Sequence, residues 1–83
     1  MAAAIESDVR RFIGENFLFG GGVQLGANDS LLGSGVIDST GVLELVGYLE
    51  RHFAISVEDH ELIPENLDSI SRISTYVARK TAG

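Results

Sequence analysis

The sequence predicts an all-α fold, a four-helix bundle with three main helices, one short helix and a long first loop. In three stretches of the chain, apolar residues recur at intervals of three and four, which is the spacing of one face of a helix. Six glycines lie between residues 20 and 35, too many for a helix interior. At 83 residues the chain suits one domain, which we expect to cover residues 1–83.

The first predicted helix runs from Ile5 to about Phe19, where a run of glycines begins the loop. The loop continues to Asp38, and its second half is expected to be ordered because apolar side chains can hold it against the helices. The helix stripe consists of Ile5, Val9, Phe12, Ile13 and Phe17, and the loop residues expected to pack are Leu25, Leu31, Leu32, Val36 and Ile37.

The second predicted helix begins at Asp38 or Ser39, both of them good N-caps, and runs to about Phe53. Residues 58–62 are expected to form a short helical turn, and residues 64–67 a short helix with proline in its first turn. The apolar stripe of the second helix consists of Val42, Leu45, Val46, Leu49 and Phe53.

A final helix is predicted over residues 69–80, with two basic residues favourably placed near its C-terminus. Its inward side chains are expected to be Ile70, Ile73 and Val77, with Arg72, Arg79 and Lys80 outside.

Composition excludes several classes of function. Without cysteine there is no disulfide, thiolate zinc site or cysteine nucleophile. No basic region precedes an apolar stretch near the N-terminus, and no window approaches the roughly 20 apolar residues of a membrane span. We therefore expect a cytoplasmic protein with no membrane span.

The formal charge of −6 argues against nucleic acid as a partner, because phosphates would be repelled. The charge is uneven along the chain. Residues 29–68 hold nine acidic residues and one basic residue, whereas the last fifteen residues hold three basic residues and no acidic one. An acidic middle of this kind can steer basic protein partners, or it can simply be a solvated surface.

The most informative segment runs from Leu31 to Val46 and reads LLGSGVIDSTGVLELV, a glycine-broken loop that delivers an Asp-Ser pair to a helix N-terminus. This segment resembles the attachment segment of acyl and peptidyl carrier proteins, in which phosphopantetheine is carried on the serine. The resemblance continues through Glu50, Phe53 and the LIPENLDSI sequence of residues 62–70. With the first helix, it covers nearly the whole chain and implies the four-helix bundle of the acyl-carrier type.

The resemblance implies a phosphoprotein that bears phosphopantetheine on Ser39, next to Asp38, and holds an acyl or aminoacyl group on that arm as a thioester. It implies a monomer that catalyses nothing itself and takes part in lipid or secondary metabolite biosynthesis. The implied partners are a phosphopantetheinyl transferase, an acyl- or aminoacyl-loading ligase, and a downstream acyltransferase or synthase. A phosphodiester is also favourable there, because the N-terminus of a helix carries partial positive charge.

The alternative is that Asp38 and Ser39 only cap a helix, in which case the chain is an unmodified acidic helical interaction module. An enzyme is disfavoured because no catalytic constellation is present: Gly20–Gly22 lacks the Lys-Ser/Thr of a phosphate loop, and Ser39 lies outside a Gly-x-Ser-x-Gly motif. The two histidines lack metal-ligand spacing, and residues 59–61, Asp-His-Glu, are expected to be a solvated turn.

The outer face of the second helix is the docking surface that the family resemblance implies. A helical wheel places four residues on that face, with Leu43 and Glu50 at its flank; the four are Thr40, Glu44, Gly47 and Arg51. Within the family that this chain resembles, carriers of fatty-acid synthesis usually have a leucine directly after the serine and an apolar residue where Gly47 stands. Glycine within a helix costs on the order of 1 kcal/mol relative to alanine, so Gly41 and Gly47 are both expected to weaken this helix. The residues expected to contact partners are Thr40, Leu43, Glu44, Gly47 and Glu50.

Overall fold

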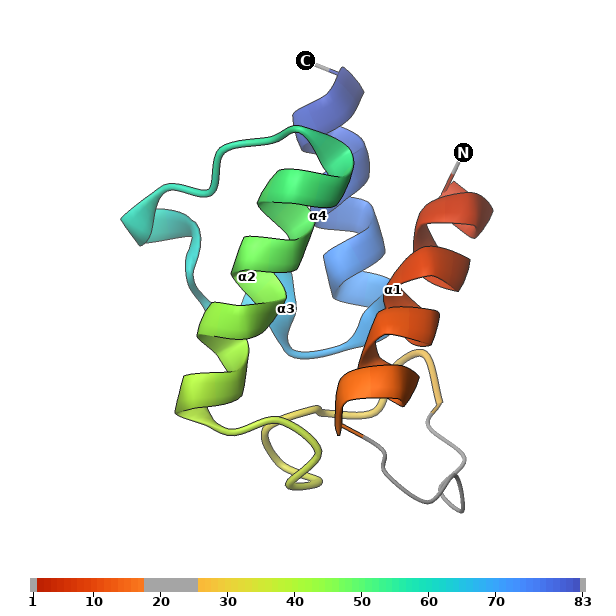
Figure 1. Cartoon of the computed structure of the whole chain (residues 1–83), viewed down its shortest axis with the longest axis vertical. Coiled ribbons are helices and arrows are strands. Elements are labelled where there is room, and N and C mark those ends of the chain that lie inside the picture. The colour runs from red at the N-terminus through yellow and green to blue at the C-terminus, as the bar shows by residue number, and fades with distance from the viewer. Residues whose placement is uncertain (1, 18–25, 83) are drawn as a thin grey trace.

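The structure, a computed structural model, describes residues 2–17 and 26–82, and all regular elements within these ranges are helical (Figure 1). The predicted all-α fold with three main helices is confirmed. The start of α1 and the end of α4 lie at one end of the molecule, and the start of α2 lies at the other (Figure 1). The elements are α1 (Ala2–Phe17), α2 (Ser39–Phe53), the 3-10 helix η1 (Asp59–Glu61), α3 (Pro64–Leu67) and α4 (Ile70–Ala82).

The element boundaries agree closely with the predicted ones. The helix α2 begins at Ser39 with Asp38 as its N-cap, and it ends at Phe53, followed by the C-cap Ala54 in a left-handed conformation with φ 56°. The predicted turn over residues 58–62 is η1, and α3 has proline at its start as expected. The helix α1 begins before Ile5, while its predicted end at Phe19 lies outside the described residues, as do Gly20–Gly22 and Leu25.

The core lies where α1 and α4 pack side by side, with α2 closing it from another side (Figure 1). The inward residues predicted for α4 are all fully buried, and Tyr76, which the wheel did not select, is buried with them. Burial of this apolar set is what holds the small fold together. The buried apolar residues are Val9, Ile13, Leu31, Ile37, Leu45, Leu49, Leu67, Ile70, Ile73, Tyr76 and Val77.

The second half of the first loop is ordered, as predicted, and it packs against the core through Leu31, Val36 and Ile37, of which Val36 is only partly buried. Leu31 and Ile37 are buried, and the Ile37 amide donates to the Leu31 carbonyl at 3.1 Å. The loop is also tied to α4, since the Ser71 amide donates to the Ala27 carbonyl at 2.8 Å. Leu32, also expected to hold the loop against the helices, is 45% exposed and borders a surface pocket between the loop, α2 and α3 instead of joining the buried set.

Gly41 is a close-approach position between α1, α2 and the loop. A Cβ atom at Gly41 would lie 2.9 Å from Phe17 Cε1 and 3.0 Å from Ile37 Cγ2, so any larger side chain would force these neighbours apart. Gly41 is accordingly buried, and it does not belong to the outer face of α2. Gly41 lowers helix propensity, as expected, but its lack of a side chain also lets Phe17 and Ile37 pack closely against α2. The sequence does not reveal this second effect.

An aromatic stack joins α1 to α2. The rings of Phe12 and Tyr48 stack with centroids 4.1 Å apart, and the His52 ring continues the stack 4.9 Å beyond Tyr48. His52 Nε2 lies 3.1 Å from a carboxylate oxygen of Asp8. This histidine therefore has a structural contact across the two helices, and no cluster able to hold a metal ion is found within residues 2–17 and 26–82. In the same ranges, no helix has the length and apolar character needed to cross a bilayer.

Candidate functional site

The Asp-Ser pair lies at the start of α2, and the structure gives its two members different roles. Asp38 is extended, with φ −102° and ψ −175°, and its Oδ1 accepts a hydrogen bond from the Gly41 amide at 2.7 Å. Asp38 is therefore the N-cap, which satisfies one of the free amides of the first turn. Ser39 is the first residue of the helix and is exposed, and its hydroxyl makes no hydrogen bond to the part of the chain that the structure describes.

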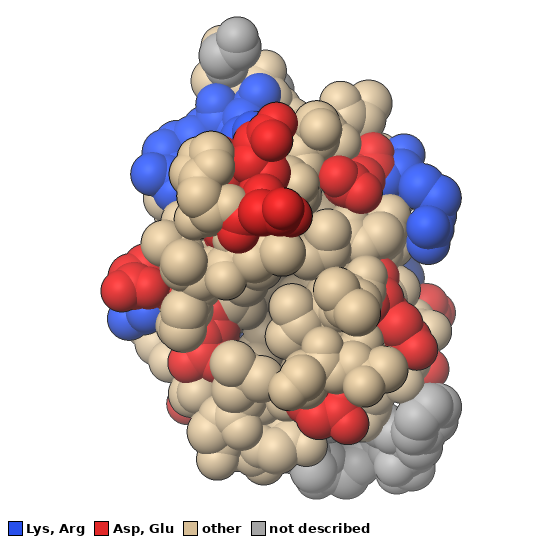
Figure 2. Space-filling view, turned by 90° about the vertical axis from the view of Figure 1, so that its left-hand side faces the viewer, with Lys and Arg blue, Asp and Glu red and all other residues tan. Residues whose placement is uncertain are grey.

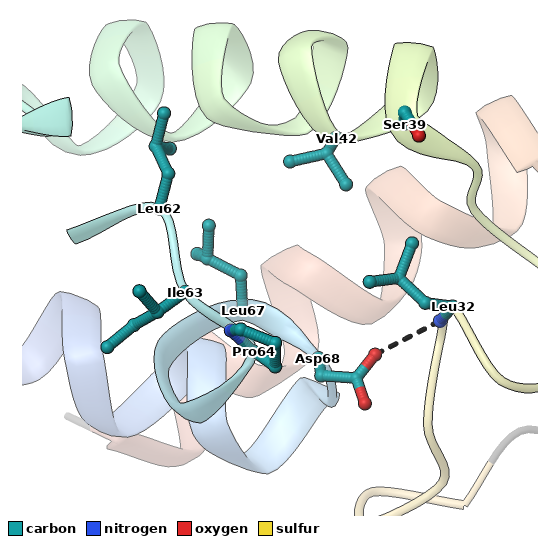
Figure 3. A pocket seen from close by; sticks show the side chains of 8 residues that line it. All are labelled: Leu32, Ser39, Val42, Leu62, Ile63, Pro64, Leu67 and Asp68. Atoms are coloured by element: carbon teal, nitrogen blue, oxygen red, sulfur yellow. Dashed lines mark hydrogen bonds between the residues drawn. The ribbon is translucent and has the colours of Figure 1, made fainter. Parts of the chain in front are cut away.

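A pocket of about 250 Å³ opens beside Ser39, between α2 and the segment that contains α3. Figure 3 shows Val42 of α2 and Leu67 of α3 pointing toward each other from opposite sides, with Leu32 at the loop end. The pocket wall is mainly apolar, and two of its side chains, Leu62 and Ile63, are about 40% exposed. Exposed apolar residues around a hollow are typical of a surface that receives a ligand or a partner.

Among the described residues, Asp68 is the one charged residue in the pocket wall. Figure 2 looks at the side of the molecule where α2 and the segment of residues 55–63 lie, and it shows an uncharged area in the lower half, bordered by acidic side chains. The one carboxylate in the pocket wall, that of Asp68, is turned toward the Leu32 amide (Figure 3). Apolar groups that enter the pocket would therefore meet little charge.

Some of the residues predicted to contact partners are exposed, whereas others already contact parts of this chain. Thr40, Leu43 and Glu44 are exposed, and Leu43 is the most exposed large apolar side chain of the described residues, at 65%. Gly47 is partly covered, since a Cβ atom there would lie 3.2 Å from a guanidinium nitrogen of Arg51. Glu50 is half-buried, and its Oε2 accepts a hydrogen bond from the Val57 amide at 3.0 Å.

Glu61 has a structural role that the sequence analysis missed, and the expectation of a solvated turn is wrong for this residue. Its Oε1 accepts hydrogen bonds from the Glu58 amide at 2.9 Å, from Tyr76 Oη at 3.0 Å and from Lys80 Nζ at 3.0 Å. The bonds from Tyr76 and Lys80 clamp η1 onto α4. They join residues 15 and 19 positions apart, so no local pattern in the sequence could have indicated them.

These contacts shift the pKa values of Glu61 and Tyr76. The hydrogen bond from the Glu58 amide, followed by that from Lys80, lowers the pKa of Glu61 to about 2. Burial, followed by the hydrogen bond to Glu61, raises the pKa of Tyr76 to about 12. The folded state therefore prefers an ionised Glu61 and a protonated Tyr76.

We expect Glu61→Gln to be less sensitive to acid than the wild type. The folded pKa of Glu61 lies below its unfolded value, so the stability it adds is present above about pH 4.5 and is lost as the pH falls toward about 2. Urea midpoints at pH 7, 4.5 and 2.5 should fall less in the variant than in the wild type. Glu65→Gln is the matched control, because Glu65 is exposed and has no partner among the described residues. Equal acid sensitivity of Glu61→Gln and Glu65→Gln would contradict the clamp.

The start of α2 fits a phosphopantetheine group. A phosphodiester on the Ser39 hydroxyl would lie at the positive end of a helix of 15 residues, which favours its negative charge. The nearest carboxylate in sequence, that of Asp38, is already engaged with the Gly41 amide. The apolar pocket beside Ser39 leaves room for a group attached there.

Comparison with known proteins settles the family. A family model described as "phosphopantetheine attachment site" matches residues 21–77, which is more than half of the chain. The chain belongs to this family. The resemblance to acyl and peptidyl carrier proteins is thus confirmed, and the cofactor of this carrier protein is covalently attached phosphopantetheine. A search of the curated proteins gave no match.

Proposed function

We propose that this carrier protein bears phosphopantetheine on the Ser39 hydroxyl and presents an acyl or aminoacyl group to a succession of partner enzymes. The observation that carries the proposal is the exposed Ser39 hydroxyl, which is left without a hydrogen bond in the described chain because Asp38 caps the helix. When bound, the arm supplies a thiol on which the group is held as a thioester. The chain itself catalyses nothing in this proposal; it positions the serine and offers a surface beside it.

The partners of the proposal are those that such a carrier requires. A phosphopantetheinyl transferase attaches the arm, an acyl- or aminoacyl-loading ligase charges it, and a downstream acyltransferase or synthase removes the group. The uncharged area and its acidic border lie on the side of the molecule where α2 runs (Figure 2), which suits partners with a basic rim. The carrier is proposed to act as a cytoplasmic monomer over residues 1–83.

The direct test is modification of the purified protein. Incubated with coenzyme A and a broad-specificity phosphopantetheinyl transferase, the protein should gain the mass of one phosphopantetheine, and fragmentation should locate it on Ser39. Circular dichroism confirms that the substrate is folded. A folded protein with no mass change would contradict the proposal and favour the unmodified interaction module.

We further propose that partners dock on the exposed side of α2, with Leu43 as the apolar contact and Glu44 as a charged contact. Whatever lies beside Ser39 must face the partner that receives the arm. A small contact with exposed charges also suits rapid release, since such charges act mainly on the rate of encounter. Glu50 contributes less freely in this proposal, because its carboxylate already accepts from Val57. Thr40 and Gly47 have small side chains and would keep the exposed side of α2 smooth.

Glu44→Lys should therefore slow modification by the transferase, and Arg51→Glu should speed it. Both effects should be larger at low salt than at high salt, because ions screen exposed charges. Initial rates of mass gain at two salt concentrations measure this. Glu6→Lys is the control for a charge reversal elsewhere, because Glu6 is in the first half of α1, whose start lies at the other end of the molecule from the start of α2 (Figure 1). If Glu44→Lys matches the wild-type rate at low salt, the docking assignment is wrong.

A further inference from the structure

Both oxygens of one carboxylate hold the loop that leads to Ser39. Ser30 Oγ donates to Asp68 Oδ2 at 2.6 Å, and the Leu32 amide donates to Asp68 Oδ1 at 3.0 Å. The Leu31 amide also donates to the backbone carbonyl of Asp68 at 2.7 Å. Three successive loop residues are therefore clasped to the junction of α3 and α4, 36 to 38 residues further along the chain. Hydrogen bonds to a charged acceptor are among the stronger ones in proteins.

The clasp connects to the serine through a short series of contacts. The Leu31 carbonyl accepts from the Ile37 amide at 3.1 Å, and both side chains are buried. The residue after Ile37 is Asp38, the cap of α2, and Ser39 follows directly. Two backbone hydrogen bonds, from Leu31 to Asp68 and from Ile37 to Leu31, and two residues of chain thus link Asp68 to the serine.

Asp68 also belongs to the surroundings of the serine. Its side chain and that of Leu32 both line the pocket on which Ser39 lies, and the hydrogen bond between them closes the pocket at the loop end (Figure 3). The hydrogen bond from Ser30 lowers the pKa of Asp68 below its usual value, so the carboxylate is charged at neutral pH. In the structure, the clasp is therefore made by an ionised group with both oxygens in use.

We propose that Asp68 is a positioning residue for Ser39: by clasping residues 30–32 to the start of α4, it fixes where α2 presents the serine hydroxyl to the modifying enzyme. The inference rests on the proposed function, because it assigns Asp68 to the modification of Ser39. Without the clasp, the loop would occupy several positions, and only a fraction of the molecules would present the serine correctly. The apparent affinity of the transferase would then fall in proportion to that fraction.

The test compares Asp68→Ala with Ser30→Ala and with Asp59→Ala. Ser30→Ala leaves α3 and α4 untouched, so it remains informative if Asp68→Ala folds poorly. It removes the Ser30 bond of the clasp together with the bond that Ser30 Oγ accepts from the Gly33 amide at 2.8 Å. Asp59→Ala is the matched control, because Asp59 is an exposed aspartate and its side chain has no partner in the described chain. The first readout is amide hydrogen exchange, and the second is the transferase reaction, with KM and kcat measured separately.

We expect the Leu32 and Ile37 amides to exchange at least about 10-fold faster in Asp68→Ala, while amides in the middle of α4 such as Tyr76 change much less. The KM for the protein should rise at least about 5-fold with kcat nearly unchanged. Ser30→Ala should show smaller changes of the same kind, and Asp59→Ala should show none. A purely structural role would instead raise exchange in all helices together and leave KM unchanged for the folded fraction.

The two proposals fail in different ways. A folded wild-type protein that takes up no phosphopantetheine contradicts the proposed function, whatever the exchange data show. Wild-type exchange at the Leu32 and Ile37 amides in Asp68→Ala contradicts the clasp. Faster exchange there with an unchanged KM shows that the clasp exists but does not position Ser39, and it overturns the inference.

Discussion

Ser39→Ala is expected to take up no phosphopantetheine and to keep the stability of the wild type. The serine hydroxyl is the group that would accept the arm, so its removal should abolish the mass gain completely. Stability should be kept because the hydroxyl is exposed and makes no hydrogen bond in the described chain. Alanine is also a better helix former than serine, and residue 39 is the first residue of α2.

Two controls make this result decisive. Ser34→Ala removes a hydroxyl from the loop that precedes α2, one that donates to the Leu31 carbonyl at 3.3 Å, and this variant should be modified normally. Asp38→Ala removes the N-cap and should lower the free energy of unfolding by about 0.5–2 kcal/mol. Intact mass and thermal denaturation, measured on all three variants, separate the carrier from the helix-cap alternative. A modified Ser39→Ala protein, or one destabilised as much as Asp38→Ala, would refute the assignment.

The same substitution at the two glycines of α2 is expected to change stability in opposite directions. Gly41→Ala would bring its Cβ within 3.0 Å of Phe17 and Ile37. Ile37 is buried and cannot move freely, so the overpacking should lower the free energy of unfolding by about 1–3 kcal/mol. Gly47→Ala meets only the far end of the Arg51 side chain, at 3.2 Å, which can swing away. Its gain in helix propensity should raise the free energy of unfolding by about 0.5–1 kcal/mol.

Urea denaturation of both alanine variants, with a common m-value, measures this difference directly. Each variant is the control for the other, because the substitution and the helix are the same and only the neighbours differ. Gly47→Ala also leaves the Ser39 segment intact, so its transferase rate reports whether the low relief of this face matters for docking. Equal stabilities for the two variants would show that α1 and the loop can withdraw from Gly41 without cost.

The sequence alone predicts much of the fold because helices and their ends have recognisable local sequence patterns. The apolar periodicity of residues 42–53 predicts the length and inner face of α2, and Leu45 and Leu49 are fully buried as expected. Proline at position 64 predicts the start of α3, and the Asp-Ser pair predicts the start of α2. These signals act over at most four residues, which is the range of a helical hydrogen bond or a cap.

The tertiary structure decides what depends on contacts between distant parts of the chain. Either residue of the Asp-Ser pair is a good cap by composition, and only the backbone geometry assigns that role to Asp38 and leaves the Ser39 hydroxyl exposed. By helix propensity Gly41 and Gly47 carry the same expected cost, and only the packed structure shows that the first lies against Phe17 of α1 and Ile37 of the loop. Asp68 lies 38 residues from its partner Ser30, so its hold on the loop arises only when α4 and the loop meet in the folded chain. The sequence therefore determines the helices and the candidate serine, whereas packing between distant segments determines how that serine is presented.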